Sequence, residues 1–479
     1  MPTTNPKTTT MARYKEYGYD IQNGKAIIPE WETEIKEEAF KDCKELTSIE
    51  FPRWIKKIGN FAFYGCANLT DIILSEWVEE IKGDVFFCCQ NLKSIFLPRW
   101  LKWIGGSAFR SCNNLMFISV SKDNKVYDSR EGCNAIIHTE SNTLICGCKN
   151  TIIPPSVTKI GYSAFYACSG LTSISIPNSV TTIGRNAFCY CSNLTSISIP
   201  PSVTEIEDDA FFCCSSLTNI SIPASVTKIG RGAFSGCSSL TSVEGPIFIV
   251  KQFSSSQLNS FVISEEATKI EECAFRGYSS LERITIPPSV TEIGNGAFEG
   301  CSCLTSISIP PSVTKIGYEA FCGCSRLTGI TVSKDNKVYD SREDCNAIIH
   351  TESNTLIRGC KNTIIPPSVT KIGDGAFSRC SSLTSITIPP SVTEIGDEAL
   401  YLCSRLTCIS IPPSVTTIGR NAFRYCSNLT SIIIPPSVTR IFWGAFSDCS
   451  NLTEIHIPKG CDVDISAFSN CPNVQIIRY

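Results

Sequence analysis

The sequence predicts an α/β repeat solenoid, in which parallel strands and short helical turns stack in about sixteen coils of 23 residues. The first observation is the pattern PPSVTKIGxxAFxxCSxLTSIxI, which recurs every 23 residues over most of the chain. A period of this length is typical of stacked supersecondary units. The second observation is that each column of the repeat keeps its chemistry. One such column contains Cys168, Cys191, Cys214 and Cys237.

The strand of one coil is predicted in the segment LTSISIP, Leu171 to Pro177. Ile174 and Ile176 alternate with serines, which is the period of a half-buried strand. Pro177 has no N–H to donate and therefore ends the strand. Strands of successive coils are expected to pair in parallel and to merge their apolar columns into one core.

The rest of the coil is predicted to be a return segment and a short helical turn. Val180 faces inward on the return segment, which ends at Gly184. In the following RNAFCYC, the apolar residues Ala187, Phe188 and Cys191 recur at helix spacing. The coil is therefore read as strand, return segment and helical turn.

The cysteines are interpreted as structural thiols. The chain has 28 of them, and fifteen occupy the repeat column. A residue that recurs at one place in every coil stacks on its own copies, and a free Cys there behaves as a small buried hydrophobe. Disulfides between neighbouring coils stay open as an alternative, because the spacing of adjacent strands is within disulfide reach.

Two insertions interrupt the period. The segments Ser121 to Gly161 and Ser333 to Gly373 are identical except at Gly132/Asp344 and Cys146/Arg358. They start 212 positions apart, which indicates duplication of a long block. Each contains CNAIIHTESNTLI, whose two apolar runs flank a polar centre and predict a β-hairpin. In a third interruption, IFIVKQF predicts a strand and SSSQLNS a polar loop.

The predicted organisation follows these interruptions. It comprises an N-terminal tail and cap (1–25), Trp-rich repeats (26–120), a hairpin insertion (121–153), repeats (154–240), an irregular insertion (241–263), repeats (264–332), a second hairpin insertion (333–365), and C-terminal repeats with a cap (366–479).

Composition excludes several classes of partner. The net charge is −3 and charged residues make up 18% of the chain, so no phosphate-binding surface is indicated and nucleic acid is not expected as a partner. No apolar run approaches the roughly 20 residues that span a bilayer, so membrane insertion is not expected. The segment Met1 to Asp20 is polar and shows no export signal.

A tryptophan column is the first candidate binding surface. It occupies the place of the serines of later coils, such as Ser179 and Ser202. Its members are Trp31, Trp54, Trp77 and Trp100. Exposed aromatic residues supply contact area in interfaces. The alternative is that these indoles pack on each other and on Trp103 to close the N-terminal end of the stack.

The outward strand face is the second candidate. Its hydroxyl residues in two coils are Thr172, Ser173, Ser175, Thr195, Ser196 and Ser198. Such an array suits binding of a glycan or an extended protein. The alternative is that Ser and Thr simply fit exposed strand positions.

Metal binding and catalysis receive little support. Cys133, His138, Cys146 and Cys148 lie within one insertion, and Cys with His can hold zinc. However, the second copy has Arg358 in place of one cysteine, and the CxC spacing is unusual. The alternative, a hairpin with incidental thiols, is preferred, and no metal or other cofactor is predicted. With three histidines and no nucleophile beside them, no enzyme is predicted.

The LxxIxI strand, the 23-residue period and the IGxxAFxxCSxL segment together resemble the BspA-like, or Treponema-type, leucine-rich repeat family over residues 26–479. The resemblance implies a right-handed, curved leucine-rich repeat solenoid. It also implies non-enzymatic adhesion or binding at a cell surface, often to host extracellular matrix or surface proteins.

The predicted function is therefore a non-enzymatic, adhesin-like binding protein with a protein or glycan partner. An intracellular interaction module or effector is the alternative. The resemblance favours a cell-surface or secreted location, whereas the absent export signal and the unpaired cysteines favour the cytoplasm.

Overall fold

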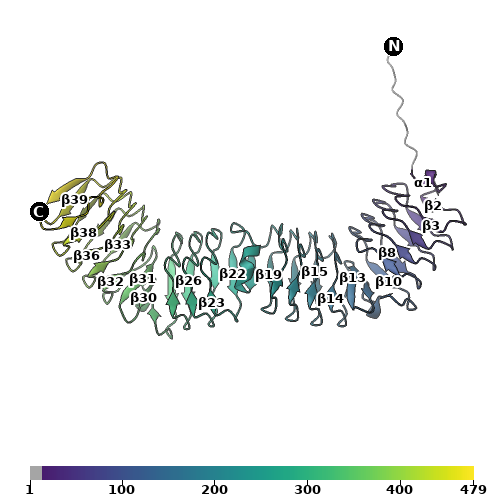
Figure 1. Cartoon of the computed structure of the whole chain (residues 1–479), viewed down its shortest axis with the longest axis horizontal. Coiled ribbons are helices and arrows are strands. Elements are labelled where there is room, and N and C mark those ends of the chain that lie inside the picture. The colour runs from purple at the N-terminus through teal and green to yellow at the C-terminus, as the bar shows by residue number, and fades with distance from the viewer. Residues whose placement is uncertain (1–12) are drawn as a thin grey trace, which may run out of the picture. The chain divides into compact units, whose positions relative to one another are not determined.

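The computed structural model describes residues 13–479 of the chain, which form two compact units that divide between Leu240 and Thr241. Each unit is a solenoid of successive coils (Figure 1). The predicted parallel-strand solenoid with two hairpin insertions is confirmed. Of the tail and cap predicted at 1–25, residues 1–12 lie outside the described residues.

The first described residues cover the start of the core. They form helix α1 (Arg13–Glu16) and an antiparallel pair, β1 (Asp20–Gln22) with β2 (Lys25–Ile27). Tyr14 and Tyr19 are buried, and each stacks on Phe40 with ring centroids 5.7 Å apart. Aromatic rings therefore close this end of the apolar column.

A ladder of longer strands forms one side of each coil. In the first unit its strands after β2 are β4 (Ser48–Glu50), β6 (Asp71–Ile73), β8 (Ser94–Leu97), β10 (Phe117–Val120), β15 (Ser173–Ser175), β17 (Ser196–Ser198) and β19 (Asn219–Ser221). In the second unit they are β21 (Ser242–Gly245), β22 (Ser260–Ile263), β24 (Arg283–Thr285), β26 (Ser306–Ile309), β28 (Gly329–Val332), β33 (Ser385–Thr387), β35 (Cys408–Ser410), β37 (Ser431–Ile433), β39 (Glu454–Ile457) and β41 (Gln475–Arg478). Paired neighbours within this ladder are parallel and in register, as in Ser173 opposite Ser196.

A second parallel ladder of two-residue strands lies on the return segment, where the sequence predicted only inward-facing residues. In the first unit it contains β3 (Glu34–Ile35), β5 (Lys57–Ile58), β7 (Glu80–Ile81), β9 (Trp103–Ile104), β14 (Lys159–Ile160), β16 (Thr182–Ile183), β18 (Glu205–Ile206) and β20 (Lys228–Ile229). In the second it contains β23 (Lys269–Ile270), β25 (Glu292–Ile293), β27 (Lys315–Ile316), β32 (Lys371–Ile372), β34 (Glu394–Ile395), β36 (Thr417–Ile418), β38 (Arg440–Ile441) and β40 (Asp462–Val463). Opposite charges face each other across it: the Lys57 amine lies 3.8 Å from the Glu80 carboxylate.

The expected helical turn is instead a non-helical turn. Within the described residues, the helices besides α1 are the 3-10 segments η1 (Arg130–Gly132), η2 (Ile247–Gln252) and η3 (Arg342–Asp344). In RNAFCYC, Asn186 and Tyr190 have φ values of 57° and 59°, in the left-handed region, which interrupts a helix.

The backbone N–H groups of this turn alternate in direction. Phe188 N–H donates to the Ala210 carbonyl of the next coil at 2.7 Å, and Cys191 N–H donates back to the Phe188 carbonyl at 3.1 Å. The turns of successive coils are therefore joined by a third ladder of backbone hydrogen bonds, although their apolar residues recur at helix spacing. The left-handed residues cost conformational energy that these bonds offset.

The core is formed by stacked columns of side chains. The Phe165 and Phe188 rings stack at 5.0 Å between centroids, and Phe188 and Phe211 at 5.3 Å. All three rings are fully buried. Replacing one of them by Ala would cost about 3 to 5 kcal/mol through the cavity left behind.

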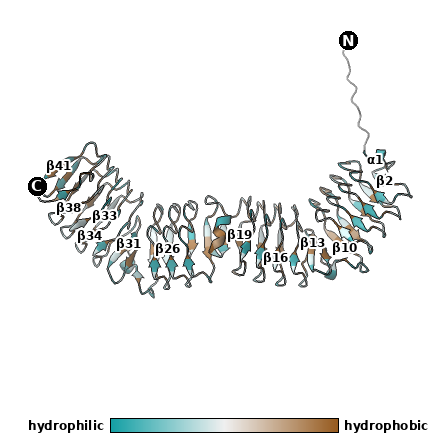
Figure 2. Ribbon diagram, in the orientation of Figure 1, coloured by the Kyte–Doolittle hydropathy of each residue, from teal (hydrophilic) through white to brown (hydrophobic). Residues whose placement is uncertain are grey.

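The predicted strand in IFIVKQF is wrong, because this segment forms η2, which is brown in Figure 2. The helix follows Pro246, and its buried residues are Ile249 and Val250. The strand of this insertion is β22, which begins at Ser260, thirteen residues after the start of the predicted strand, and it pairs in parallel with β21.

The two hairpin insertions fold alike. The first contains β11 (Tyr127–Asp128), β12 (Ala135–His138) and β13 (Thr143–Gly147), and the second contains β29 (Tyr339–Asp340), β30 (Ala347–His350) and β31 (Thr355–Gly359). Strands β12 and β13 are antiparallel, and β13 pairs in parallel with β14. The hairpin therefore extends the short-strand ladder at its first edge, and the predicted hairpin is confirmed.

Candidate functional site

The tryptophan column lies on the turns that follow the long strands of the first coils. Trp31, Trp54 and Trp100 are 66%, 49% and 42% exposed, and Trp77 is half-buried. Within the described residues, the only stacked pair among them is Trp77 with Trp100, at 6.3 Å between centroids. Packing of indoles therefore involves one end of the column and leaves Trp31, Trp54 and Trp100 partly in contact with solvent.

The residues that replace these tryptophans in later coils have a structural role. Ser202 donates its hydroxyl to the Val180 carbonyl at 2.7 Å, and Ser225 donates to the Val203 carbonyl at 2.8 Å. Ser202 and Ser225 therefore each bond their own coil to the one before it, whereas the buried Ser179 hydroxyl has no such partner among the described residues. Tryptophan has no hydroxyl to make this bond, so the first coils give up an inter-coil bond in exchange for an exposed indole.

Arginines lie against two of the indoles. The Arg53 guanidinium is 5.1 Å from the Trp54 ring centroid, and the Arg99 guanidinium is 4.7 Å from that of Trp100. A cation over an aromatic face is attracted by the ring quadrupole. The column thus presents rigid aromatic surface with positive charge beside it.

The outward strand face of the same coils includes four exposed apolar side chains among charged and polar ones, which the sequence analysis missed. Ile27, Ile73, Phe96 and Phe117 are 42%, 61%, 57% and 54% exposed. Phe96 and Phe117 lie on the paired strands β8 and β10. The detectable signal was Ile or Phe at strand positions that hold Ser in later coils. We call these four residues and the four tryptophans the N-terminal apolar surface.

The hydroxyl residues of later coils divide into two groups. Thr195 donates its hydroxyl to the Thr172 carbonyl at 3.1 Å, so the threonine column bonds coils together. The four serines are exposed, with Ser173 opposite Ser196 and Ser175 opposite Ser198. The four serines, together with Thr172, present outward hydroxyls without a bond of this kind among the described residues.

The cysteine column lies in the core and makes a hydrogen bond that its sequence does not reveal. Cys191, Cys214 and Cys237 are fully buried. Cys191 donates its thiol to the Phe165 carbonyl of the preceding coil at 3.0 Å, and Cys214 donates to the Phe188 carbonyl at 3.1 Å. Cys168 is half-buried, and the loss of solvent around its thiol raises the pKa of that thiol to about 12. All 28 cysteines are free thiols.

The cysteines and histidine of the first hairpin do not gather. His138 is partly exposed and its Nδ1 lies 3.0 Å from the Ser141 hydroxyl, whereas the buried Cys148 donates to the Met116 carbonyl at 3.3 Å. Across residues 13–479, no three Cys, His, Asp or Glu side chains lie together as metal ligands. Nor does this part of the chain contain a helix long and apolar enough to cross a membrane.

The coils are interrupted where each hairpin enters. We call residues 97–112, 121–128, 145–148 and 161–168 the first joint, and the equivalent residues 309–324, 333–340, 357–360 and 373–380 the second joint. In the first joint, hairpin residue Gly147 replaces a complete turn and donates its N–H to the Ala164 carbonyl at 2.8 Å. A Cβ on Gly147 would lie 2.1 Å from the Phe165 ring, so only glycine fits.

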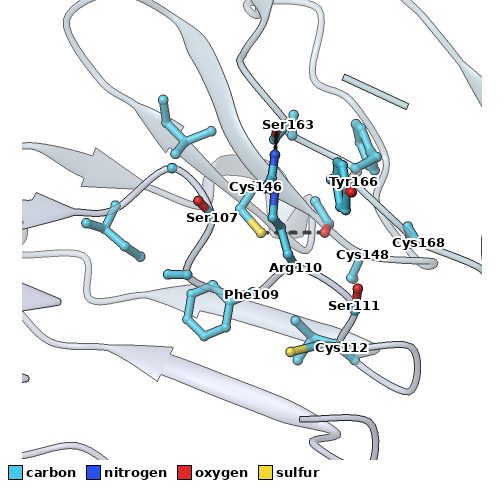
Figure 3. Close-up of a pocket in the computed structure, with 18 of the residues that line it drawn as sticks. Ser107, Phe109, Arg110, Ser111, Cys112, Cys146, Cys148, Ser163, Tyr166 and Cys168 are labelled. Carbon is cyan, nitrogen blue, oxygen red and sulfur yellow. Dashed lines mark hydrogen bonds between the residues drawn. The ribbon is translucent and has the colours of Figure 1, made fainter. Parts of the chain in front are cut away.

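Arg110 bridges the first joint (Figure 3). Its guanidinium lies 3.8 Å from the Tyr166 ring centroid and donates to the Ser163 hydroxyl at 2.5 Å. Beside it is a small cavity of about 20 Å³, whose lining includes Cys112, Cys146 and Cys168. Little space is therefore left beside the arginine in this joint.

Arg358 has the corresponding position in the second joint, but it extends from the hairpin. It is 4% exposed, and it donates to the Gly375 and Ser378 carbonyls at 3.2 and 3.1 Å. In both joints the arginine Nε is buried and has no hydrogen-bond partner among the described residues.

Comparison with known proteins agrees with this architecture. The BspA type leucine rich repeat region matches residues 17–132, 142–252, 247–345 and 353–475. None of the curated proteins matches the chain.

Several solved structures are similar. A leucine rich cell surface protein from Faecalibacterium prausnitzii is 32% identical, with 74% of this chain and 93% of that chain covered and a TM-score of 0.44. A leucine-rich repeat protein from Eubacterium ventriosum is 24% identical, with 64% and 84% covered and a TM-score of 0.38. The pneumococcal vaccine antigen PcpA is 17% identical, with 74% and 93% covered and a TM-score of 0.41. From the family match over most of its length, the chain belongs to the BspA-type leucine-rich repeat family.

Proposed function

We propose that the protein is a non-enzymatic, adhesin-like binding protein whose N-terminal apolar surface contacts another protein. Leucine-rich repeat proteins generally act as binding scaffolds and mediate protein interactions. The variable outward residues of such a scaffold select the partner, because the repeat consensus is used to form the core.

The observation that carries the proposal is the pairing of exposed residues in the first coils. Three of the four exposed apolar strand residues are followed four positions later by a tryptophan: Ile27 by Trp31, Ile73 by Trp77 and Phe96 by Trp100. Clustered exposed apolar side chains on a soluble surface mark interaction sites. Trp and Arg are also the residue types that dominate interface hot spots.

The chemistry of this surface favours a protein partner over a glycan. Aliphatic Ile27 and Ile73 offer no hydrogen bonds to sugar hydroxyls, whereas they match the apolar centre of a protein interface. We propose a host matrix or surface protein as the partner. An intracellular interaction module or effector is the second candidate, which the 28 free thiols favour, since disulfides accumulate in oxidising compartments.

The test replaces Trp54 and Trp77 by Ser in one variant and measures binding to purified collagen, laminin and fibronectin by biolayer interferometry. We expect the variant to lose at least about tenfold in affinity, because truncation of one hot-spot residue costs 2 kcal/mol or more. The matched control is Ser196→Ala with Ser198→Ala, which changes the strand face of later coils and should retain binding.

Thermal melting separates binding from packing. Because Trp54 is about half exposed and the half-buried Trp77 stacks only on Trp100 among the tryptophans of the described column, we expect the melting temperature of the tryptophan variant to fall only modestly. A large drop would show that the indoles stabilise the stack and would overturn the proposal. So would equal binding by the variant and the unmodified protein, and failure to bind any of the three matrix proteins would exclude these partners and favour the intracellular candidate.

A further inference from the structure

We propose that an open aromatic pocket beside the first joint binds a neutral saccharide. The pocket has a volume of about 380 Å³, within the range of small-molecule sites. We call it the tyrosine pocket. It is lined by Arg110, Tyr162, Tyr166, Asn186, Cys189, Tyr190, Asp209 and Phe212.

Two aromatic rings give the pocket its apolar surface. Tyr162 is 50% exposed and Tyr190 is 45% exposed, so both rings are available to a ligand. The face of an aromatic ring is electron-rich. One face of a pyranose presents C–H groups with partial positive charge, which such a ring attracts. Exposed tyrosines around a concave surface are therefore suited to stack on sugar rings.

The polar residues of the pocket fit sugar hydroxyls. Asn186 offers an amide donor and acceptor, and Asp209 offers two carboxylate acceptors. Among the described residues, neither side chain has a hydrogen-bond partner. Sugar hydroxyl groups can donate hydrogen bonds to the Asp209 carboxylate, and they can both donate to and accept from the Asn186 amide. These bonds would orient the sugar, while the aromatic rings provide contact area.

Charge in the pocket favours a neutral ligand. The position over the Tyr166 ring that a cationic ligand would take is already occupied by the Arg110 guanidinium, which lies 3.8 Å from the ring centroid. This guanidinium is also 5.6 Å from the Tyr162 ring centroid. The Asp209 carboxylate opposes an anionic ligand, and together these two residues carry no net charge.

The pocket is held in place by contacts between coils. Tyr190 N–H donates to the Phe212 carbonyl at 2.8 Å, and the Tyr190 ring meets the Phe212 ring edge-on at 5.5 Å. The Tyr166 and Tyr190 rings also meet edge-on, at 5.6 Å. A preorganised aromatic surface loses little conformational entropy on binding.

The second joint supplies an internal control. The positions equivalent to Tyr162, Tyr166 and Tyr190 hold Asp374, Ser378 and Leu402. The adjoining hairpin was copied almost without change, yet the aromatic pocket beside it is absent from the copy. The aromatic lining is therefore not required for a hairpin to join the stack.

The test uses saturation-transfer difference NMR on the full chain with lactose, cellobiose, maltose and N,N′-diacetylchitobiose. We expect at least one disaccharide to receive saturation on its ring protons. Tyr190→Leu, which introduces the residue of the second joint, should weaken that binding at least tenfold. The matched control is Tyr401→Leu in the second unit, which removes a tyrosine from a turn outside the pocket and should leave binding unchanged.

A second variant tests the polar contacts without changing the rings. Asp209→Ala should also weaken binding, and its thermal melting curve identifies any loss of folding. Absence of binding by all four disaccharides would overturn the proposal. Binding that persists in both pocket variants would place the sugar elsewhere and overturn it equally. Neither outcome bears on the N-terminal apolar surface, whose protein partner is tested separately.

Discussion

The two joints contain almost the same hairpin but fill the gap beside it in opposite ways. In the first, Arg110 extends from the preceding turn and Cys146 stands on the hairpin. In the second, the equivalent turn residue is Cys322 and the hairpin residue is Arg358. Both arginines reach the turn that follows, at Ser163 in the first joint and Gly375 in the second. Each joint therefore accommodates one long cationic side chain and one thiol, whichever element provides them.

The comparison of the two joints distinguishes the contacts that a joint needs from the residues that can vary. The required contacts are the ones that both joints share. Asn124 donates to the Pro98 and Leu101 carbonyls at 2.8 and 3.0 Å and accepts from the Val126 and Tyr127 N–H groups. Asn336 makes the same four bonds in the second joint.

The largest effect is expected from removal of this asparagine. Asn124→Ala and Asn336→Ala should each destabilise their joint by about 3 kcal/mol or more, because every buried group left without a partner costs roughly 1 to 3 kcal/mol. Amide hydrogen exchange at Tyr127 and Tyr339 measures the loss. Asn193→Ala, at an exposed site with one bond to a carbonyl, is the control and should cost much less. Unequal losses at the two joints would contradict a shared requirement.

An exchange of arginine and cysteine should have the next largest effect. In the first joint, Arg110→Cys removes the bridge and Cys146→Arg adds a second guanidinium to a small space, so each single change should lower the melting temperature. The double variant recreates the arrangement of the second joint and should recover part of both losses, with a coupling of about 1 to 3 kcal/mol. Strictly additive losses would show that the two positions are independent.

Lowering the pH should have the smallest effect on stability, and the effect should be equal at the two hairpins. Burial alone would raise the pKa of Asp128, but hydrogen bonds from Arg130 and Thr139 outweigh it and lower that pKa; Asp340 has the same surroundings. A carboxyl with a lowered folded-state pKa stabilises the fold above its unfolded pKa of about 3.9 and loses this contribution as pH falls through the folded value. Because both aspartates are partly exposed, the contribution should be under about 1 kcal/mol.

This pH dependence is measured by melting curves of the native protein and of Asp128→Asn. The stability difference between them should shrink as pH falls below about 4. The corresponding Asp340→Asn variant should show the same trend. A difference that grows with acid would contradict the assigned direction.

The sequence predicted the parts of the fold that repeat. The 23-residue period and the alternation around Ile174 were sufficient for the strands and the core, because burial on one face dictates both. The turn after Gly184 was predicted as a helix because apolar spacing alone cannot reveal that alternate N–H groups bond to the next coil. The short-strand ladder was missed because two residues are too few to show a period.

The candidate surfaces were predictable to a lesser degree. The tryptophan column was visible as a departure from the serine column, although its exposure was not. The exposed apolar strand residues of the first coils, such as Phe96 and Phe117, were missed because the strand positions were compared only in later coils, where Ser and Thr occupy them. The tyrosine pocket was not predictable, since it combines Arg110 with residues more than fifty positions later, and their proximity depends on how the hairpin replaces a turn.

The bonds of Asn124 have a consequence for a protein that is pulled along its stack of coils. In a ladder, neighbouring strands share several parallel hydrogen bonds that must break together, so tension is spread among them. Strand β9 instead meets the first hairpin through the Tyr127 hydroxyl, which accepts from the Ile104 N–H at 3.3 Å, while Asn124 ties the adjoining loops. When the protein is pulled, each unit should therefore unfold first at its joint. The unit should then lengthen in one discrete step while its uninterrupted coils stay folded.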